Sequence, residues 1–391
     1  MLTVEAAQDR LLGLARPLPS QELSLAKAIG CYLAREIVAL RSQPAADLSA
    51  MDGYAIRFAE LPGPLDLVGE SAAGSPYLEC TRPGQAVRIS TGAHVPEGTD
   101  TILVQEEALF KAGKIWLDGS GPGIEGRHIR RAGSDFKEGD KLIPTGALMQ
   151  AGALAAAAMA GYSTICVGGA PRVKIVGTGN ELVPPGTMMR NGQIPSSNNI
   201  MLNAMLSQLP CSTTDAGIVG DQLDDIVAIF QDSDAYDIIV TTGGASVGDH
   251  DLVQAAMIAM GAEISFWKVA MRPGKPLMAG RIGSTIVVGL PGNPSSAFVT
   301  AILFLLPLIR HMAGSSTPLP ETVYASSSIE LPPTGERCEY LRGFVQRGMI
   351  SAFGKQDSGL ITPLIGANGL LYRAAHAPSL AVGELVPYIA L

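Results

Sequence analysis

The chain has 391 residues, and 47% of them are hydrophobic while only 16% are charged. Such a chain can bury large cores, so global disorder is excluded. At about 150 residues per domain, the length predicts several domains. The formal net charge is −8 at pH 7. Because nucleic acids and anionic membranes are bound by basic surfaces, this balance argues against either as a partner.

The five cysteines are scattered and never spaced as CxxC, which predicts free thiols in a reducing compartment. A secretory signal begins with basic residues followed by an apolar stretch, and the early Glu5 and Asp9 do not fit that pattern. The longest apolar stretches, residues 147–162 and 297–309, are too broken or too short for a bilayer, which needs about 20 residues. We therefore expect a cytoplasmic protein.

The first part of the chain predicts a helical domain with a β-rich insertion. Val4, Ala7 and Leu11 recur at helical spacing, and residues 23–40 predict a second amphipathic helix. Residues 1–44 and 146–170 are therefore expected to form a helical N-terminal or linker domain. Between them, residues 45–145 carry short strand patterns separated by turns, which predicts an inserted β-rich domain.

Residues 171–316 alternate strands with helices, which predicts a mainly parallel α/β sheet covered by helices on both faces. The last segment, residues 317–391, is rich in short strands and turns and predicts a small β-barrel. The elements expected in the α/β domain are strands at 172–178, 212–219, 237–242, 263–270 and 284–290 and helices at 198–209, 222–231, 252–260 and 294–309.

Three glycine-rich turns follow strands of the α/β domain: GTGNE (177–181), TTGGASVGDHD (241–251) and GLPGNPSSA (289–297). The carboxyl ends of parallel strands form the ligand-binding edge of an open α/β sheet. Glycines there let backbone N–H groups approach an anion. None of the turns is GxGxxG or GxxxxGK[ST], so a dinucleotide fold and a P-loop are not supported. The candidate binding residues in the last two turns are Gly243, Gly244, Ser246, Pro291, Pro294 and Ser296.

Charged residues near these turns predict an anion site with a hard cation. Arg272 and Lys275 share the tight turn MRPGKP (271–276), and two close cations are stabilised by an anion. Several carboxylates together would suit Mg²⁺ bridging to phosphates. Taken singly, each has an ordinary alternative as a turn former, an ion-pair partner or a helix cap. The carboxylates are Asp52, Asp135, Glu181, Asp221, Asp249 and Asp251. Asn293 and Pro294 likewise suit a helix start, as cap and first residue.

The ordered set of motifs resembles the molybdopterin molybdenumtransferase family, the MoeA-type proteins that include the gephyrin E-domain. The matching pieces span nearly the whole chain. They are SAMDGYA (49–55), RISTGAHVPEGTD (88–100), RRAGSDF (130–136), GTGNEL (177–182), SSN (196–198), TTGGASVGDHD, MRPGKP and GLPGNPSSA, with weaker matches at CEYLRG (338–343) and QDSGL (356–360).

The resemblance implies an elongated homodimer in which residues 45–145 act as a lid over the partner's α/β domain. It implies an enzyme that takes adenylylated molybdopterin and molybdate as substrates. With Mg²⁺ or another divalent cation, such enzymes release AMP and yield molybdenum cofactor. Other proteins of molybdenum cofactor biosynthesis are expected as further partners.

By motif position, the resemblance assigns catalytic roles to Asp52, Glu181, Asp221, Asp251 and Lys275. It assigns metal binding to Asp135, Glu181, Asp221 and Asp251. Thr91, Arg272, Lys275, Ser296 and Ser358 match its substrate-binding positions. Which carboxylate acts as the base stays open.

Three positions depart from the family pattern. Asn180 stands where Asp is usual, Arg272 where Lys is usual, and Pro363 where a second serine is common. Arg keeps the charge of Lys but presents a planar fork.

Two alternative functions remain: an adenylyltransferase acting on molybdopterin, and a non-catalytic molybdopterin carrier or scaffold. The helical, lid and barrel segments argue against the first, and the retained carboxylates argue against the second.

Overall fold

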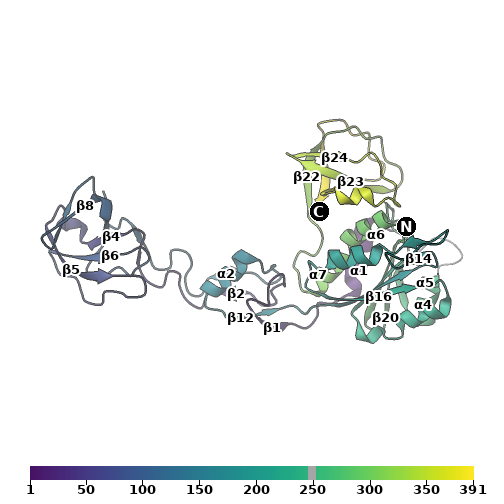
Figure 1. Cartoon of the computed structure of the whole chain (residues 1–391), viewed down its shortest axis with the longest axis horizontal. Helices are drawn as coiled ribbons and strands as arrows, with labels where there is room; N and C mark the ends of the chain where they lie inside the picture. Colours follow the sequence, from purple (N-terminus) through teal and green to yellow (C-terminus); the bar gives the residue numbers. More distant parts are fainter. Residues whose placement is uncertain (245–251) are drawn as a thin grey trace. The chain divides into compact units, whose positions relative to one another are not determined.

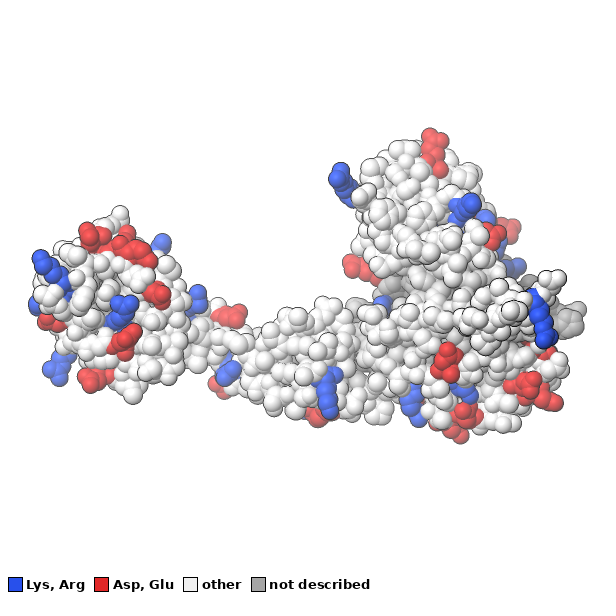
Figure 2. Space-filling model, in the orientation of Figure 1, with Lys and Arg blue, Asp and Glu red and all other residues white. Residues whose placement is uncertain are grey.

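The computed structural model describes residues 1–244 and 252–391 (Figure 1). Its contacts divide the chain into two compact units. Unit 1 comprises Met1–Arg35, Thr145–Gln150 and Ile165–Leu391, and unit 2 comprises Glu36–Pro144 and Ala151–Thr164. On the face in Figure 2, basic and acidic side chains are interspersed over both units.

The centre of unit 1 is a six-stranded sheet in the order β16-β13-β17-β21-β20-β18. The first four strands are parallel, β20 runs antiparallel to them, and β18, antiparallel to β20, runs in their direction again. The predicted mainly parallel sheet is therefore confirmed, and its reversed strand, β20, is not among the predicted strands. The strands are β13 (Arg172–Thr178), β16 (Ser212–Val219), β17 (Ile238–Thr242), β18 (Glu263–Phe266), β20 (Met278–Ile282) and β21 (Thr285–Leu290).

Helices cover both faces of this sheet, because successive side chains of a strand point to opposite faces. In β17, Ile238 and Val240 pack with one set of helices, while Ile239 packs with the other. The first face is covered by α1 (Val4–Leu14), α3 (Asn198–Leu206) and the helix from Pro294 to Met312. The second is covered by α4 (Leu223–Phe230) and α5 (Leu252–Ala259).

The helix from Pro294 to Met312 is long and strongly apolar. It consists of α6 (Pro294–Thr300), a π-helical turn (Ala301–Leu305) and α7 (Leu306–Met312). Its length and a mean hydropathy of 1.5 would allow it to cross a membrane, but 78% of that apolar window is buried inside unit 1. Its apolar sequence is explained by its place in the core, against β17, β21 and α1.

The predicted second helix at residues 23–40 is wrong. This segment contains β1 (Gln21–Ser24) and β2 (Ile37–Val38), joined by turns. Its backbone groups bond to distant residues: Leu33 N–H donates to the Ala147 carbonyl at 2.9 Å and Ala34 N–H to the Cys166 carbonyl at 2.8 Å. These long-range bonds override a weak local preference for helix. β12 (Thr164–Val167) pairs with β1, and α2 (Ala151–Met159) of unit 2 falls in the segment 146–170 that was predicted to be helical.

Unit 2 is built mainly of strands, as predicted. Its main sheet has the order β7-β4-β6-β5-β9-β8, and two small ribbons pair β3 with β10 and β2 with β11. Gly53 opens β4 against the backbone of β7, where a Cβ would lie 2.1 Å from the Leu103 carbonyl oxygen. The strands are β3 (Leu48–Ser49), β4 (Gly53–Ile56), β5 (Leu65–Ser71), β6 (Gln85–Ile89), β7 (Thr101–Val104), β8 (Ala108–Lys111), β9 (Lys114–Leu117), β10 (Ile129–Arg130) and β11 (Lys141–Ile143).

The predicted C-terminal barrel is confirmed. Strands pair in the order β23-β24-β22-β26-β25, and β25 closes the barrel by pairing with β23. The short β19 (Met271–Arg272) runs parallel to β23 and joins the barrel to the α/β domain. Cys338 and Tyr340 of β23 belong to the same hydrophobic core as the helices on the first face of the α/β sheet. The remaining elements are β22 (Thr322–Ser327), β23 (Cys338–Gln346), β24 (Met349–Ala352), α8 (Thr362–Ile365), β25 (Gly369–Arg373) and β26 (Leu385–Ala390).

Candidate functional site

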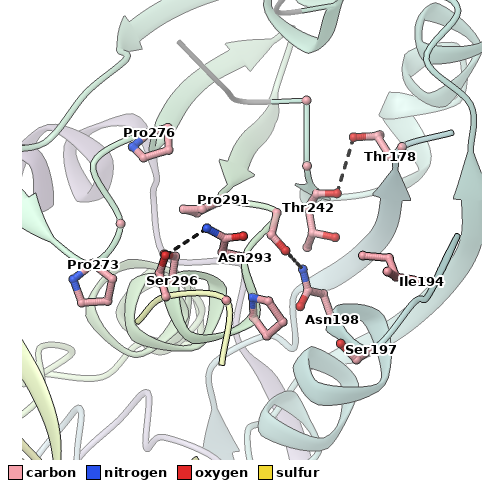
Figure 3. A pocket seen from close by; sticks show the side chains of 18 of the residues that line it. Thr178, Ile194, Ser197, Asn198, Thr242, Pro273, Pro276, Pro291, Asn293 and Ser296 are labelled. Carbon is pink, nitrogen blue, oxygen red and sulfur yellow. Dashed lines mark hydrogen bonds between the residues drawn. The ribbon is translucent and has the colours of Figure 1, made fainter. Parts of the chain in front are cut away.

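A cavity of about 980 Å³ lies at the carboxyl ends of β13, β17 and β21 in unit 1. The glycine turns after these three strands reach its wall, as the parallel arrangement predicts. Loop residues 356–359 of the barrel form another part of the wall. Figure 3 shows side chains from these segments around the cavity.

The first two turns contact each other closely. The Thr178 hydroxyl donates to the Thr242 carbonyl at 3.4 Å (Figure 3). Gly243 has φ +98°, and a Cβ there would lie 2.3 Å from the Thr178 carbonyl oxygen. Only glycine fits this approach without displacing the first turn. Gly243 and Gly244 both line the cavity, whereas Ser246 lies outside the described residues.

The third turn connects the cavity to the barrel. Pro294 occupies the start of α6, as predicted, but the expected side-chain cap by Asn293 is wrong. The Asn293 Nδ2 instead donates to the Ser358 hydroxyl at 2.9 Å, because the barrel loop approaches the helix start. The Ser295 N–H donates to the Ser358 carbonyl at 3.1 Å. These bonds place Ser358 on the cavity wall, which Pro291, Pro294 and Ser296 also line.

Three basic side chains line the cavity. Arg272 and Lys275 come from the predicted turn 271–276, and Arg337 immediately precedes β23. Arg272 forms a 3.4 Å ion pair with Glu339, although its side chain is 61% exposed. The Lys275 carbonyl accepts from the N–H groups of Val269 and Leu277, both at 3.1 Å, which holds the turn. In the ranges 1–244 and 252–391, the Lys275 ammonium forms no ion pair.

Sequence reasoning missed Arg337 and two further wall residues, Gln356 and Asp357. The available signal was their position, since Arg337 directly precedes CEYLRG and the other two belong to QDSGL. The fully buried Arg342 holds this loop, because its Nη2 donates to the Asp357 carbonyl at 3.0 Å. Burial of the Arg342 guanidinium lowers its pKa.

Glu181 and Asp221 are the predicted carboxylates that line the cavity. Asp221 accepts the Asn180 N–H at 3.1 Å, and its own N–H donates to the Asn180 Oδ1 at 3.0 Å. This exchange joins the loop after β13 to the loop after β16. Asp249 and Asp251 lie outside the described residues.

Asp52, Thr91 and Asp135 belong to unit 2. The Asp52 Oδ1 accepts from the Thr91 N–H at 2.6 Å and from the Thr91 hydroxyl at 2.9 Å. These hydrogen bonds lower the pKa of Asp52, since they stabilise its ionised form. Asp135 is exposed, and its possible partner Arg131 pairs with Asp47 at 2.6 Å. The structure thus brings Asp52 and Thr91 together.

The side chains on the cavity wall supply only some of the ligands that a hard cation needs. Among the described residues, no three His, Cys, Asp or Glu side chains cluster to hold a metal. Glu181 and Asp221 nevertheless offer carboxylate oxygens on the cavity wall. Mg²⁺ commonly takes one or two carboxylates and completes its shell with water and substrate phosphates. Their chemistry therefore fits Mg²⁺ bound together with a phosphate-bearing substrate.

Comparison with known families covers nearly the whole chain. Residues 2–161 match the family described as MoeA N-terminal region (domain I and II). Residues 174–311 match the probable molybdopterin binding domain, and residues 324–391 match the MoeA C-terminal region (domain IV). The three matches follow the order of the MoeA proteins.

Individual relatives agree with this result. The molybdopterin molybdenumtransferase of Haemophilus influenzae is 33% identical, over 99% of this chain and 98% of the relative. That of Staphylococcus aureus strain COL is 28% identical over 99% and 95%. A crystal structure of the molybdopterin biosynthesis MoeA protein of Pyrococcus horikoshii superposes with a TM-score of 0.82 at 25% identity, covering 100% of this chain and 99% of that one. The resemblance of the motifs is thus confirmed, and the chain belongs to the MoeA family of molybdopterin molybdenumtransferases.

Proposed function

We propose that this chain is a transferase that inserts molybdenum into molybdopterin. The observation that carries the proposal is the cavity wall, where Arg272, Lys275 and Arg337 lie beside the glycine turns of a parallel sheet. Molybdate and a phosphate-bearing pterin are anions, and both need fixed cations and backbone N–H groups. The 33% identical relative with this activity spans the same length.

In this proposal, Lys275 and Arg272 bind the oxyanions of the two substrates. Lys275 brings a compact ammonium on a turn held by two backbone hydrogen bonds. Arg272 brings a planar fork that can bind two oxygens at once. Because the Ser358 hydroxyl accepts from Asn293, its own proton is free to donate toward a bound anion. Ser296, with Pro291 and Pro294, supports this end of the cavity.

In more detail, the proposed reaction includes the Mg²⁺-dependent release of AMP from adenylylated molybdopterin. Glu181 and Asp221, with Asp251 and Asp135, are the residues that would hold the metal. When bound, Mg²⁺ would neutralise the phosphate charge that develops as the anhydride breaks. Asp52, Thr91 and Asp135 would act from the unit 2 of a second copy in a cytoplasmic homodimer, which delivers its product to other proteins of cofactor biosynthesis.

The test is AMP release from adenylylated molybdopterin by the purified full chain, with and without molybdate and Mg²⁺. Wild type should release AMP in the presence of both, and Lys275→Ala should reduce the rate by at least about a hundredfold. Lys27→Ala is the matched control, since Lys27 is exposed in a turn away from the cavity wall. Tight binding of the nucleotide without AMP release under any divalent metal would refute the enzyme and favour a carrier.

A further inference from the structure

One polar atom of Asn198 forms no hydrogen bond with any residue in the described ranges. The residue begins α3, lines the cavity and is only 8% exposed. Its Nδ2 donates to the Gly292 carbonyl at 2.7 Å (Figure 3). Its Oδ1 is buried and, within the part of the chain described, accepts no hydrogen bond.

The orientation of this amide is determined by its partner. Only the amide nitrogen can donate to the Gly292 carbonyl, so the amide oxygen must be the atom that lacks a hydrogen bond. A buried acceptor without a donor destabilises the folded chain, and such groups are rare in folded proteins. Asn198 lines a large cavity, and although this oxygen itself has almost no exposed surface, a bound ligand that displaces its neighbours can donate to it.

Two aliphatic side chains line the same cavity as Asn198. Leu182 in β14 (Leu182–Val183) pairs directly with Ile194 in β15 (Ile194–Pro195), and both side chains line the cavity. Ile194 is 52% exposed. Figure 3 shows Ile194 and Asn198 on one side of the view, with Pro273 and Pro276 of the basic turn on the other.

Two aliphatic side chains and one hydrogen-bond acceptor in the same cavity suit a planar heterocycle. The aliphatic groups would cover the face of the ring, while the acceptor takes an N–H from its edge. A phosphate or molybdate is excluded as the partner of this oxygen, because a carbonyl oxygen repels an anion. The anionic part of a ligand belongs with Arg272, Lys275 and Arg337.

We infer that Asn198 is a specificity-determining residue whose Oδ1 accepts a hydrogen bond from the exocyclic amino group of a bound heterocycle. The inference rests on the proposed function, which supplies two rings with such a group, the pterin and the adenine. A ring that carries an oxo group at the same position would set two acceptors against each other. Wild type therefore discriminates between the amino and oxo forms of whichever ring binds there.

The experiment measures the dissociation constants of two matched pairs by calorimetry, without molybdate. One pair is AMP and IMP, and the other is pterin and its 2-oxo analogue lumazine. In one of the pairs, wild type should bind the amino form about tenfold or more tightly. A preference within the first pair assigns the site to adenine, and within the second to the pterin. Equal affinities within both pairs overturn the inference.

Variants separate recognition from folding. Asn198→Ala should lower the preferred ratio to near one, because the acceptor oxygen is lost. Asn199→Ala is the control: Asn199 is also buried with an unpartnered Oδ1, but its Nδ2 bonds to Asp215 and Gly217 and it does not line the cavity. It should keep the wild-type ratio even if stability falls. A ratio unchanged in Asn198→Ala overturns the inference.

Failure of the inference and failure of the proposed function have different signatures. A wild-type chain that binds the ligands but does not distinguish amino from oxo rings contradicts only the role of Asn198. A chain that shows the preference but never releases AMP contradicts the transferase and leaves the role of Asn198 intact.

Discussion

Asn180 and Asp221 form a reciprocal pair in which each residue accepts the backbone N–H of the other, at 3.0 and 3.1 Å. The pair joins the loops that follow β13 and β16, at the edge of the cavity. The family resemblance leads us to expect Asp at this position, where the chain has Asn. The amide still supplies an acceptor to the loop, so the departure preserves the contact and removes one negative charge beside Asp221.

We therefore expect Asn180→Asp to keep the loop contact but to make it dependent on a cation. Without divalent metal, repulsion from Asp221 should lower the free energy of unfolding by less than about 1 kcal/mol. Mg²⁺ should raise the melting temperature of this variant more than that of wild type. Thermal unfolding in EDTA and in Mg²⁺ checks this, with Asn180→Ala as the control that loses the acceptor and gains no charge. An equal Mg²⁺ effect in all three proteins would contradict the prediction.

Gly243→Ala should disrupt the cavity edge. The new Cβ would meet the Thr178 carbonyl oxygen at 2.3 Å, on a backbone with φ +98°. The control is Gly186→Ala, because Gly186 has φ +83° but nothing within 4 Å of its Cβ position. The control should lose about 1–2 kcal/mol of stability from backbone strain alone. Gly243→Ala should lose about 1–3 kcal/mol more, as measured by urea unfolding, and similar losses in both would argue against the close contact.

The pKa of Asp52 should depend on the Thr91 hydroxyl. Thr91→Val keeps the backbone N–H donor and removes the hydroxyl, so the pKa of Asp52 should rise toward its ordinary value but stay below it. Thr91→Ser keeps both donors and should match wild type. Carboxyl titration by NMR distinguishes the variants. An unchanged titration in Thr91→Val would mean that the hydroxyl bond is absent in solution.

Asp237 should make folding sensitive to acid. Burial pushes the pKa of its carboxyl upward, but hydrogen bonds from the Arg172 side chain and N–H outweigh this and lower it. A lowered folded pKa adds stability above the unfolded pKa, and that stability is lost as pH falls through the folded value. Asp237→Asn should therefore cost about 1 kcal/mol near neutral pH, a modest figure because Arg172 is half exposed.

The difference between wild type and Asp237→Asn should shrink below about pH 4, where the carboxyl of the unfolded chain becomes protonated. Urea unfolding from pH 3 to pH 7 measures it. Asp234→Asn serves as the comparison, because Asp234 is an exposed aspartate in the short 3-10 helix that precedes β17. A pH-independent difference for Asp237→Asn would show that lost packing, not charge, causes the destabilisation.

Local pattern determined much of this protein. The alternation of strand and helix patterns over residues 171–316, with glycine turns directly after strands, was enough to predict a sheet covered on both faces with a ligand edge. The physical reason is that side-chain alternation and turn chemistry act between residues a few positions apart. The motifs are likewise short local segments, so their order along the chain was enough to show the family resemblance.

Only the tertiary structure decided the contacts that join distant segments. Residues 23–40 have a helical pattern, yet Leu33 and Ala34 bond to residues more than 100 positions away. Asn293 suits a helix cap, yet the approach of Ser358 recruits its side chain. Arg337 and the unpartnered oxygen of Asn198 become part of one cavity only when barrel and sheet come together. A sequence specifies what each residue can offer, whereas the competition among distant partners is settled by the packing of the whole chain.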